Sequence, residues 1–295
     1  MSAPPAIAVL GAGLMGSQIG CEYALGGHRV IWIVRQVAPA RARIDAAFAL
    51  AARHGLASAA AIAAAAARVS VRDQLAGEEP VELIVESIVE ERDAKAAALR
   101  AASEWQPAAT IATNSSSIGV GELGRLAGIE ERIVATHYWN PPLLMPLVEV
   151  LAGERTPRER LARVIALLRA IGKRPVELRA DVPGLLWNRL QFAVLREALW
   201  LAEHGVATPA VIDEVMRDGL ARRWRLTGPF ETVSLGGAQT FDAIAANLFA
   251  ELSTAAGGSF APHVIGDERE LAALRERRDD ALAAELRAER ESEQR

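Results

Sequence analysis

Short apolar runs alternate with longer amphipathic segments through the first 180 or so residues of the chain. Five runs rich in branched apolar residues have the length of buried strands, and they lie at 7–10, 30–34, 83–85, 110–113 and 133–136. The segments between them include three of helical length, at 15–25, 39–53 and 90–103. Alternating strands and helices predict an α/β fold: a Rossmann-type, doubly wound, mostly parallel sheet with helices on both faces.

The pattern changes after Pro157, and helix-type segments dominate beyond Pro183. A length of 295 residues suits two domains of about 150 residues each. We therefore expect a dinucleotide-binding domain over 1–183 and an all-helical domain over 184–295 that closes the substrate pocket. The segment 267–295 is dense in arginine and glutamate, which predicts a solvated helix that frays at its end.

A glycine-rich segment, Gly11-Ala12-Gly13-Leu14-Met15-Gly16, follows the first predicted strand directly and opens the next helix. In this context the first glycine permits a tight turn, the second lets the backbone approach a pyrophosphate, and the third lets helix and strand pack closely. The N–H groups at the start of the helix then face the anion. The segment, including Leu14 and Met15, therefore predicts a dinucleotide site.

The end of the second predicted strand lacks the acid that binds the ribose 2′-hydroxyl in many NAD sites. Val34 occupies that position and Arg35 follows it. Without a carboxylate nothing repels a 2′-phosphate, and Arg35 can pair with one. The sequence thus favours NADP(H), and with it the reducing direction. NAD(H) is the alternative if Arg35 is only a solvated loop residue.

One histidine and one glutamate have the setting of an acid/base pair. His137 directly follows the strand predicted at 133–136. It therefore lies at the edge of the sheet where open α/β folds bind ligands. A neutral imidazole there can accept a proton from an alcohol as hydride leaves its carbon. Glu149 stands alone in an apolar run, where an unpaired acid is costly, so we expect it to support the other ring nitrogen.

Four stretches in this order resemble the 3-hydroxyacyl-CoA dehydrogenase family: 85–90 with Lys95, 113–118, 136–150 and 181–190. With the glycine loop, the resemblance runs from about residue 7 to about residue 252. It implies the same roles for His137 and Glu149. It also implies a homodimer and a set of further site residues: Ser116 and Asn188 on the substrate oxygen, Asn114 and Asn140 near the nicotinamide and its ribose, and Glu90 with Lys95 on the cofactor side. Ser115 and Ser117 are the alternatives to Ser116.

Departures from the family pattern bear on the substrate. Acyl-CoA members of the family that this chain resembles carry a lysine-rich turn after the second strand. In the corresponding stretch of this chain, only Arg53 and His54 are basic. The segment at 138–142, Tyr-Trp-Asn-Pro-Pro, resembles the branch of the family that contains L-gulonate dehydrogenase, lambda-crystallin and polyketide ketoreductases. We therefore expect an oxidoreductase for a 3-oxo or 3-hydroxy acid or a related ketone. The alternatives are an NAD-dependent L-3-hydroxyacyl-CoA dehydrogenase and, in another class, a crystallin-like protein that binds dinucleotide without catalysis.

Composition narrows the partners and the compartment. Lys and Arg number 33 against 37 Asp and Glu, a balance that argues against a nucleic-acid partner. The single cysteine, Cys21, excludes an intrachain disulfide and lies far from any pair of histidines, so we expect no metal site. No charged leader or long apolar span is evident, which predicts a cytoplasmic protein without a membrane partner. The expected ligands are a small molecule and the cofactor.

Overall fold

The computed structural model describes residues 6–77, 79–263 and 266–293. The chain divides into two compact units. The first unit contains the described residues up to Leu186 together with those from Arg275 onward, and the second spans Trp187–Leu274. The C-terminal segment is thus grouped with the nucleotide-binding part of the chain, although the sequence places it in the helical domain.

The first unit is built on an eight-stranded sheet with the order β3-β2-β1-β4-β5-β6-β7-β8. The strands are β1 (Ala6–Leu10), β2 (Val30–Ile33), β3 (Val69–Arg72), β4 (Val81–Glu86), β5 (Thr110–Thr113), β6 (Ile133–Tyr138), β7 (Leu147–Ala152) and β8 (Arg174–Glu177). The first six run parallel, β7 is antiparallel to β6, and β8 is parallel to β7. This confirms the predicted doubly wound, mostly parallel sheet.

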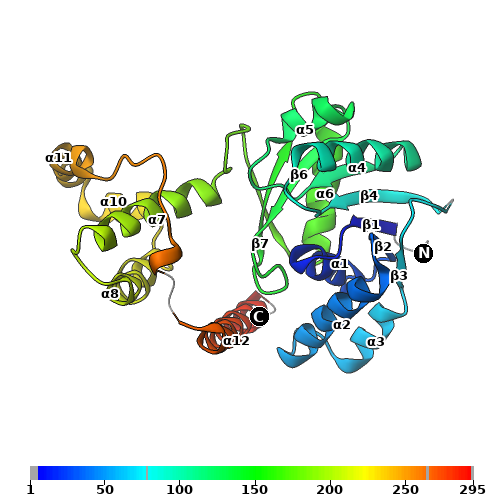
Figure 1. Ribbon diagram of the computed structural model, residues 1–295, viewed down its shortest axis with the longest axis horizontal. Helices are drawn as coiled ribbons and strands as arrows, with labels where there is room; N and C mark the ends of the chain where they lie inside the picture. The colour runs from blue at the N-terminus through cyan, green and yellow to red at the C-terminus, as the bar shows by residue number, and fades with distance from the viewer. Residues whose placement is uncertain (1–5, 78, 264–265, 294–295) are drawn as a thin grey trace. The chain divides into compact units, whose positions relative to one another are not determined.

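Helices cover both faces of this sheet (Figure 1). They are α1 (Leu14–Leu25), α2 (Val37–Arg53), α3 (Ala59–Ala66), α4 (Arg92–Trp105), α5 (Val120–Ala127) and α6 (Arg158–Ala170). Along β1 the buried side chains alternate: Ile7 and Val9 pack with residues of α1, α2 and α6, whereas Ala8 and Leu10 pack with residues of α4 and α5. The period of two places alternate residues on opposite faces, so both faces are apolar and buried.

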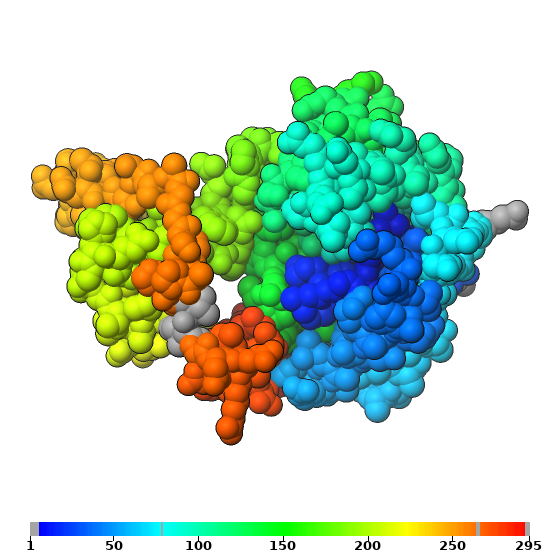
Figure 2. Space-filling view, viewed as in Figure 1, coloured from blue at the N-terminus to red at the C-terminus, as the bar shows by residue number. Residues whose placement is uncertain are grey.

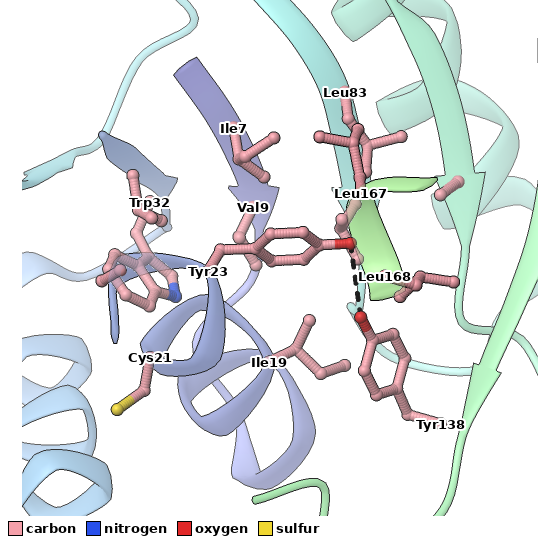
Figure 3. Packing of buried hydrophobic residues seen from close by; sticks show 14 of the residues in the cluster. Ile7, Val9, Ile19, Cys21, Tyr23, Trp32, Leu83, Tyr138, Leu167 and Leu168 are labelled. Atoms are coloured by element: carbon pink, nitrogen blue, oxygen red, sulfur yellow. Dashed lines mark hydrogen bonds between the residues drawn. The ribbon is translucent and has the colours of Figure 1, made fainter. Parts of the chain in front are cut away.

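The core on the α1 side contains two polar contacts that fix α1 on the sheet, and Figure 3 shows the one between Tyr23 and Tyr138. The indole N–H of Trp32 on β2 donates to the Gly16 carbonyl at 3.0 Å. The hydroxyls of Tyr138 on β6 and Tyr23 on α1 lie 3.3 Å apart. All these side chains are buried, and each contact satisfies a polar group that burial would otherwise leave unpaired.

The described residues of the second unit form only helices and loops. They contain α7 (Trp187–Glu203), α8 (Pro209–Glu214), a π-helix (Val215–Leu220), α9 (Ala221–Trp224), α10 (Pro229–Gly236), α11 (Ala238–Leu248) and two 3₁₀ turns (Phe249–Glu251 and Ala261–His263). This confirms the predicted helical part of the chain. No helix in the described ranges is long and apolar enough to cross a membrane.

The last helix, α12 (Glu268–Glu293), packs on the first unit over its C-terminal half. Ala283 and Leu286 are buried there, and Arg287 donates to the carbonyl of His54 at the end of α2 at 2.5 Å. Its orange-red turns lie beside the blue surface of α2 in the space-filling view (Figure 2). Most residues of this half are exposed, as expected of a solvated helix, but the expectation missed that Ala283 and Leu286 are covered.

A buried ion pair ties α1 to the loop between β6 and β7. The ammonium of Lys173 contacts the Glu22 carboxylate and donates to the carbonyls of Pro142 at 2.6 Å and Met145 at 2.9 Å. Both side chains of the pair are less than one-tenth exposed. Burial raises the pKa of Glu22 to about 7 even beside Lys173, and burial lowers the pKa of Lys173.

This pair predicts a pH-dependent stability effect. The folded-state pKa of Glu22 lies above its ordinary value, so the glutamate's contribution is full below about pH 4.5 and is lost as pH rises through about 7. Lys173→Met leaves Glu22 buried without its counter-charge. We expect it to lower the free energy of unfolding by about 3–5 kcal/mol at about pH 8. The loss should be clearly smaller at about pH 5, where Glu22 takes up a proton.

Urea unfolding at the two pH values checks this prediction. Arg174→Met is the matched control, because Arg174 is half-exposed and its pair with Glu289 is a surface contact. That variant should lose less than about 1 kcal/mol. If Lys173→Met loses the same free energy of unfolding at both pH values, Glu22 does not change its protonation between them and the prediction is wrong.

Candidate active site

A cavity of about 1070 Å³ opens beyond the carboxyl ends of β1, β2 and β4. The cavity has the size of a cofactor site and lies at the edge where open α/β sheets bind ligands. Its lining comes from the glycine loop, the end of β2, the segment after β3 and the loop after β4. The predicted site residues in that lining are Gly11, Gly13, Leu14, Met15, Arg35, Glu90, Lys95, Asn114 and Ser116.

The glycine loop fits a pyrophosphate. Gly11 has a φ of +93°, and a Cβ at this position would lie 2.5 Å from the Ser87 carbonyl oxygen. Gly13 has open space on its Cβ side, so its backbone is accessible from the cavity. Gly16 packs against the backbone of Gly11 and does not line the cavity. The first turn of α1 carries no acidic side chain, so its free N–H groups and positive end meet no competing negative charge.

The adenosine end of such a site has an unusual set of side chains. Val34 is buried, and its N–H donates to the Arg72 carbonyl on β3 at 2.8 Å. Arg35 is exposed and lines the cavity. Arg43 on α2 donates from its Nε to the carbonyl of Ala12 at 2.5 Å and also lines the cavity. Two guanidinium groups therefore border this end.

His137 and Glu149 face each other across the antiparallel pair β6–β7. They are register partners, and the Nδ1 of His137 lies 2.6 Å from an oxygen of the Glu149 carboxylate. Both are nearly fully buried, with exposures of 6% and 1%. The contact through Nδ1 leaves Nε2 as the ring nitrogen for a ligand.

A strained turn supplies a further donor to Glu149. The backbone N–H of Leu186 donates to the second carboxylate oxygen at 2.9 Å. Before it, Gly184 has a φ of +80° and Leu185 a φ of +51°, and Leu185 is the one non-glycine residue with positive φ among those the structure describes. A leucine in this region costs about 1–3 kcal/mol. The surroundings hold it there, and the turn aims the Leu186 N–H at the buried carboxylate.

A second buried charge cluster lies at the ends of β4 and β5. The ammonium of Lys95, which is 1% exposed, lies 2.6 Å from the Glu86 carboxylate and 3.0 Å from that of Glu90. Glu86 is fully buried and also accepts the N–H of Ile88 at 2.9 Å and the hydroxyl of Thr113 at 2.7 Å. These contacts hold Lys95 in place, although it borders the cavity.

Glu90 organises the serine segment. Its Oε1 accepts four hydrogen bonds of 2.6–3.1 Å, from the hydroxyls of Ser115 and Ser117 and from the N–H groups of Ser116 and Ser117. Partial burial alone raises the pKa of Glu90, but the Ser115 hydroxyl and the charge of Lys95 lower it to about 2. The carboxylate is therefore charged throughout the physiological range and fixes the loop that carries Ser116.

The three predicted asparagines have different positions. Asn114 accepts the N–H of Tyr138 at 2.9 Å and lines the cavity, so it links the ends of β5 and β6. Asn140 is exposed in the turn after β6, before a cis bond to Pro141, and does not line the cavity. Asn188 lies on α7 in the second unit.

Two acids had no predicted role: Glu86, buried behind Lys95, and Asp73, on the cavity. Glu86 directly follows the apolar run at 83–85, and an acid beside such a run is a signal close to the one that singles out Glu149 in the sequence. Asp73 follows β3, a strand that is too short and polar to predict from its pattern, and it lines the cavity. Across residues 6–77, 79–263 and 266–293, no three His, Cys, Asp or Glu side chains are grouped to hold a metal ion.

A doubly wound sheet with a glycine turn beneath a cofactor-sized cavity is the architecture of nucleotide-dependent oxidoreductases. Comparison with protein families gives the same class. The family model "3-hydroxyacyl-CoA dehydrogenase, NAD binding domain" matches residues 6–182, and "3-hydroxyacyl-CoA dehydrogenase, C-terminal domain" matches residues 184–272. The chain belongs to the 3-hydroxyacyl-CoA dehydrogenase family, as its motifs predict, and it is a dehydrogenase with a nicotinamide cofactor.

Individual relatives agree with this class. The 5-formyl-3-hydroxy-2-methylpyridine 4-carboxylate 5-dehydrogenase of Mesorhizobium japonicum is 31% identical over 254 residues, 84% of this chain and 81% of that protein. The L-carnitine dehydrogenase of Pseudomonas aeruginosa is 35% identical over 237 residues, 78% of this chain and 72% of that protein. The crystal structure of a 5-formyl-3-hydroxy-2-methylpyridine 4-carboxylic acid 5-dehydrogenase, described as "an NAD+ dependent dismutase", matches this chain with a TM-score of 0.82 at 27% identity. The match covers 96% of this chain and 97% of that one.

The contacts of Glu90 predict how its loss affects the serine segment. Glu90→Ala removes an ionised acceptor from the N–H groups of Ser116 and Ser117. We expect their amide hydrogen exchange to rise about tenfold or more near neutral pH, because hydrogen bonds to charged groups are the stronger ones. Exchange followed by mass spectrometry checks this.

Glu91→Ala is the matched control, since the neighbouring Glu91 is exposed and its side chain makes no capping hydrogen bond. It should leave exchange in the serine segment unchanged. Unchanged exchange in Glu90→Ala as well would show that other contacts hold the loop.

Proposed function

We propose that the protein interconverts the hydroxyl and oxo groups of a 3-hydroxy or 3-oxo acid, or a related ketone, with His137 as the acid/base. One observation carries this proposal: the buried 2.6 Å contact between His137 and Glu149 at the end of β6. The parallel arrangement of β1, β4, β5 and β6 brings this end to the same sheet edge as the glycine loop. An acid/base group thus lies on the ligand-binding edge.

The side chains have the following proposed roles. A nicotinamide cofactor bound in the cavity would provide the hydride acceptor or donor. Nε2 of His137 takes the proton of the substrate hydroxyl in oxidation and returns one to the carbonyl oxygen in reduction. Glu149 accepts the Nδ1 proton, which sets the tautomer and stabilises the imidazolium that forms, and the Leu186 N–H keeps that carboxylate oriented. Ser116, on the cavity, and Asn188, on the family pattern, position the substrate oxygen.

We propose NAD(H) as the cofactor. The matched domain is described as NAD binding, and the solved relative as NAD+ dependent. The preference for NADP(H) predicted from Val34 and Arg35 has no support in these comparisons. The expected reducing direction rested on that preference. Gly11, Gly13, Leu14 and Met15 would hold the pyrophosphate, and Asn114, Glu90 and Lys95, which also line the cavity, would contact the nicotinamide half.

The substrate we propose is a free acid or ketone, because the chain lacks a lysine-rich turn after β2 and because two relatives are named for a pyridine carboxylate and for carnitine. The family description keeps an NAD-dependent L-3-hydroxyacyl-CoA dehydrogenase as the second candidate. A non-catalytic crystallin-like role is set aside, since the relatives are named dehydrogenases. The homodimer implied by the family resemblance stays a prediction.

The His137–Glu149 assignment predicts kinetic losses without loss of cofactor. His137→Ala should lower kcat about 10²- to 10⁴-fold, the usual contribution of a general acid/base, and leave the Kd for NAD+ within about twofold. Glu149→Gln should lower kcat about a hundredfold, because the imidazolium loses its carboxylate. Steady-state rates and cofactor titration check both.

His204→Ala is the matched control. His204 is exposed, directly follows α7 in the second unit and stacks on Trp200 of that helix, with ring centroids 4.3 Å apart. It should keep wild-type rates. A His137→Ala enzyme with near wild-type turnover would falsify the mechanism.

The substrate class predicts a preference between matched pairs of compounds. The chain should oxidise a free 3-hydroxy acid with a kcat/KM at least about tenfold above that of its CoA thioester, equivalent to about 1.4 kcal/mol of transition-state stabilisation. Rates of nicotinamide absorbance change with each pair test this. The reverse preference selects the acyl-CoA candidate.

A further inference from the structure

At the far end of the cavity, the end of β2 lacks the expected acid, but a carboxylate follows the neighbouring strand, β3. Strands β2 and β3 are parallel, with Ile33 paired to Arg72. The pairing continues one residue further, because the Val34 N–H donates to the Arg72 carbonyl at 2.8 Å. Val34 and Asp73 are therefore the next residues on adjacent strands, whose backbones lie about 4.8 Å apart.

Asp73 is available to a ligand. It is exposed and lines the same cavity as Gly13, Val34 and Arg35. Its carboxylate forms no hydrogen bond or ion pair with another residue in the described part of the chain. The described lining of the cavity contains two acidic residues, Asp73 and Glu90. Glu90 is bound into the serine loop, which leaves Asp73 as the acid that can bind a ligand at this end.

We propose that Asp73 binds the 2′-hydroxyl of the adenosine ribose of NAD+, in place of the missing acid at Val34. This rests on the proposed cofactor and specifies how the chain recognises it. A carboxylate accepts the hydroxyl proton in a charge-assisted hydrogen bond. Val34 presents a short apolar side chain at the usual position, so the neighbouring strand supplies the acceptor.

The same carboxylate opposes the 2′-phosphate of NADP+. Arg35 and Arg43 border this end of the cavity and attract a phosphate, so the selectivity between the two cofactors depends on the balance of these charges. Asp73 contributes both terms in favour of NAD+: a hydrogen bond to the hydroxyl and repulsion of the phosphate. Removal of the Asp73 charge should therefore weaken the binding of NAD+ and strengthen the binding of NADP+.

Calorimetric titration of the full chain tests the assignment. Wild type, Asp73→Ala and the control Asp45→Ala are each titrated with NAD+, NADP+ and NAD+ lacking the 2′-hydroxyl of its adenosine. Asp45 is exposed on α2 and does not line the cavity, so its substitution removes the same charge nearby without touching the ligand. Asp73→Asn repeats the test with an uncharged side chain of the same shape.

For NAD+, Asp73→Ala should raise the Kd about tenfold or more, as expected for a lost hydrogen bond to a charged group, and Asp45→Ala should change it less than about twofold. The 2′-deoxy compound should bind wild type about tenfold more weakly than NAD+ does. It should bind Asp73→Ala no more weakly than NAD+ binds that variant, because each change removes the same contact. NADP+ should bind both Asp73 variants more tightly than wild type.

Different failures have different meanings. Asp73→Ala and wild type binding NAD+ equally would overturn the assignment and leave the NAD(H) proposal intact. Equal losses for NAD+ and its 2′-deoxy form would also overturn it, because they place Asp73 against another part of the cofactor. Wild type that binds no NAD+ contradicts the proposed cofactor itself.

Discussion

The antiparallel pairing of β6 with β7 is the constraint on which the candidate site depends. It reverses the direction of a sheet that is otherwise parallel up to β6, and it sets Glu149 directly opposite His137. Residues directly opposite on adjacent strands have Cβ atoms about 4.5–5.5 Å apart, close enough for a side-chain hydrogen bond. A shift of one residue in register would turn one of the two to the other face of the sheet and remove the pair.

The connection between these strands is held from several sides. Lys173 donates to two carbonyls of the β6–β7 loop and pairs with Glu22. Gln18, one turn earlier on α1, accepts the N–H of Leu143 in the same loop at 3.2 Å. The helix that begins at the glycine loop is therefore bonded to the loop that follows His137. The glycine turn and the His137–Glu149 pair are therefore linked through α1 and this loop.

Buried carboxylates that each face a basic side chain recur at this edge of the sheet. Glu86 with Lys95, Glu22 with Lys173 and Glu149 with His137 are all less than one-tenth exposed. Such pairs add little net stability over well-packed apolar residues, but loss of one partner is costly because it leaves a charge unpaired. Their effect is geometric: each one allows a narrow set of arrangements for the strand ends and loops around the cavity.

The sequence by itself determined the class of fold, the dinucleotide loop and the family, because these depend on local periodicity and on short contiguous motifs such as the glycine segment. It also singled out His137 and Glu149, since a polar residue at a strand end and a lone acid in an apolar run are visible in one dimension. Only the tertiary structure decided that Glu90 holds the serine segment, that α12 returns to the first unit and that Asp73 borders the cavity. Each of these depends on residues distant in the chain or on neighbouring strands, and a pairing of β2 with β3 leaves no trace in the pattern of either strand alone.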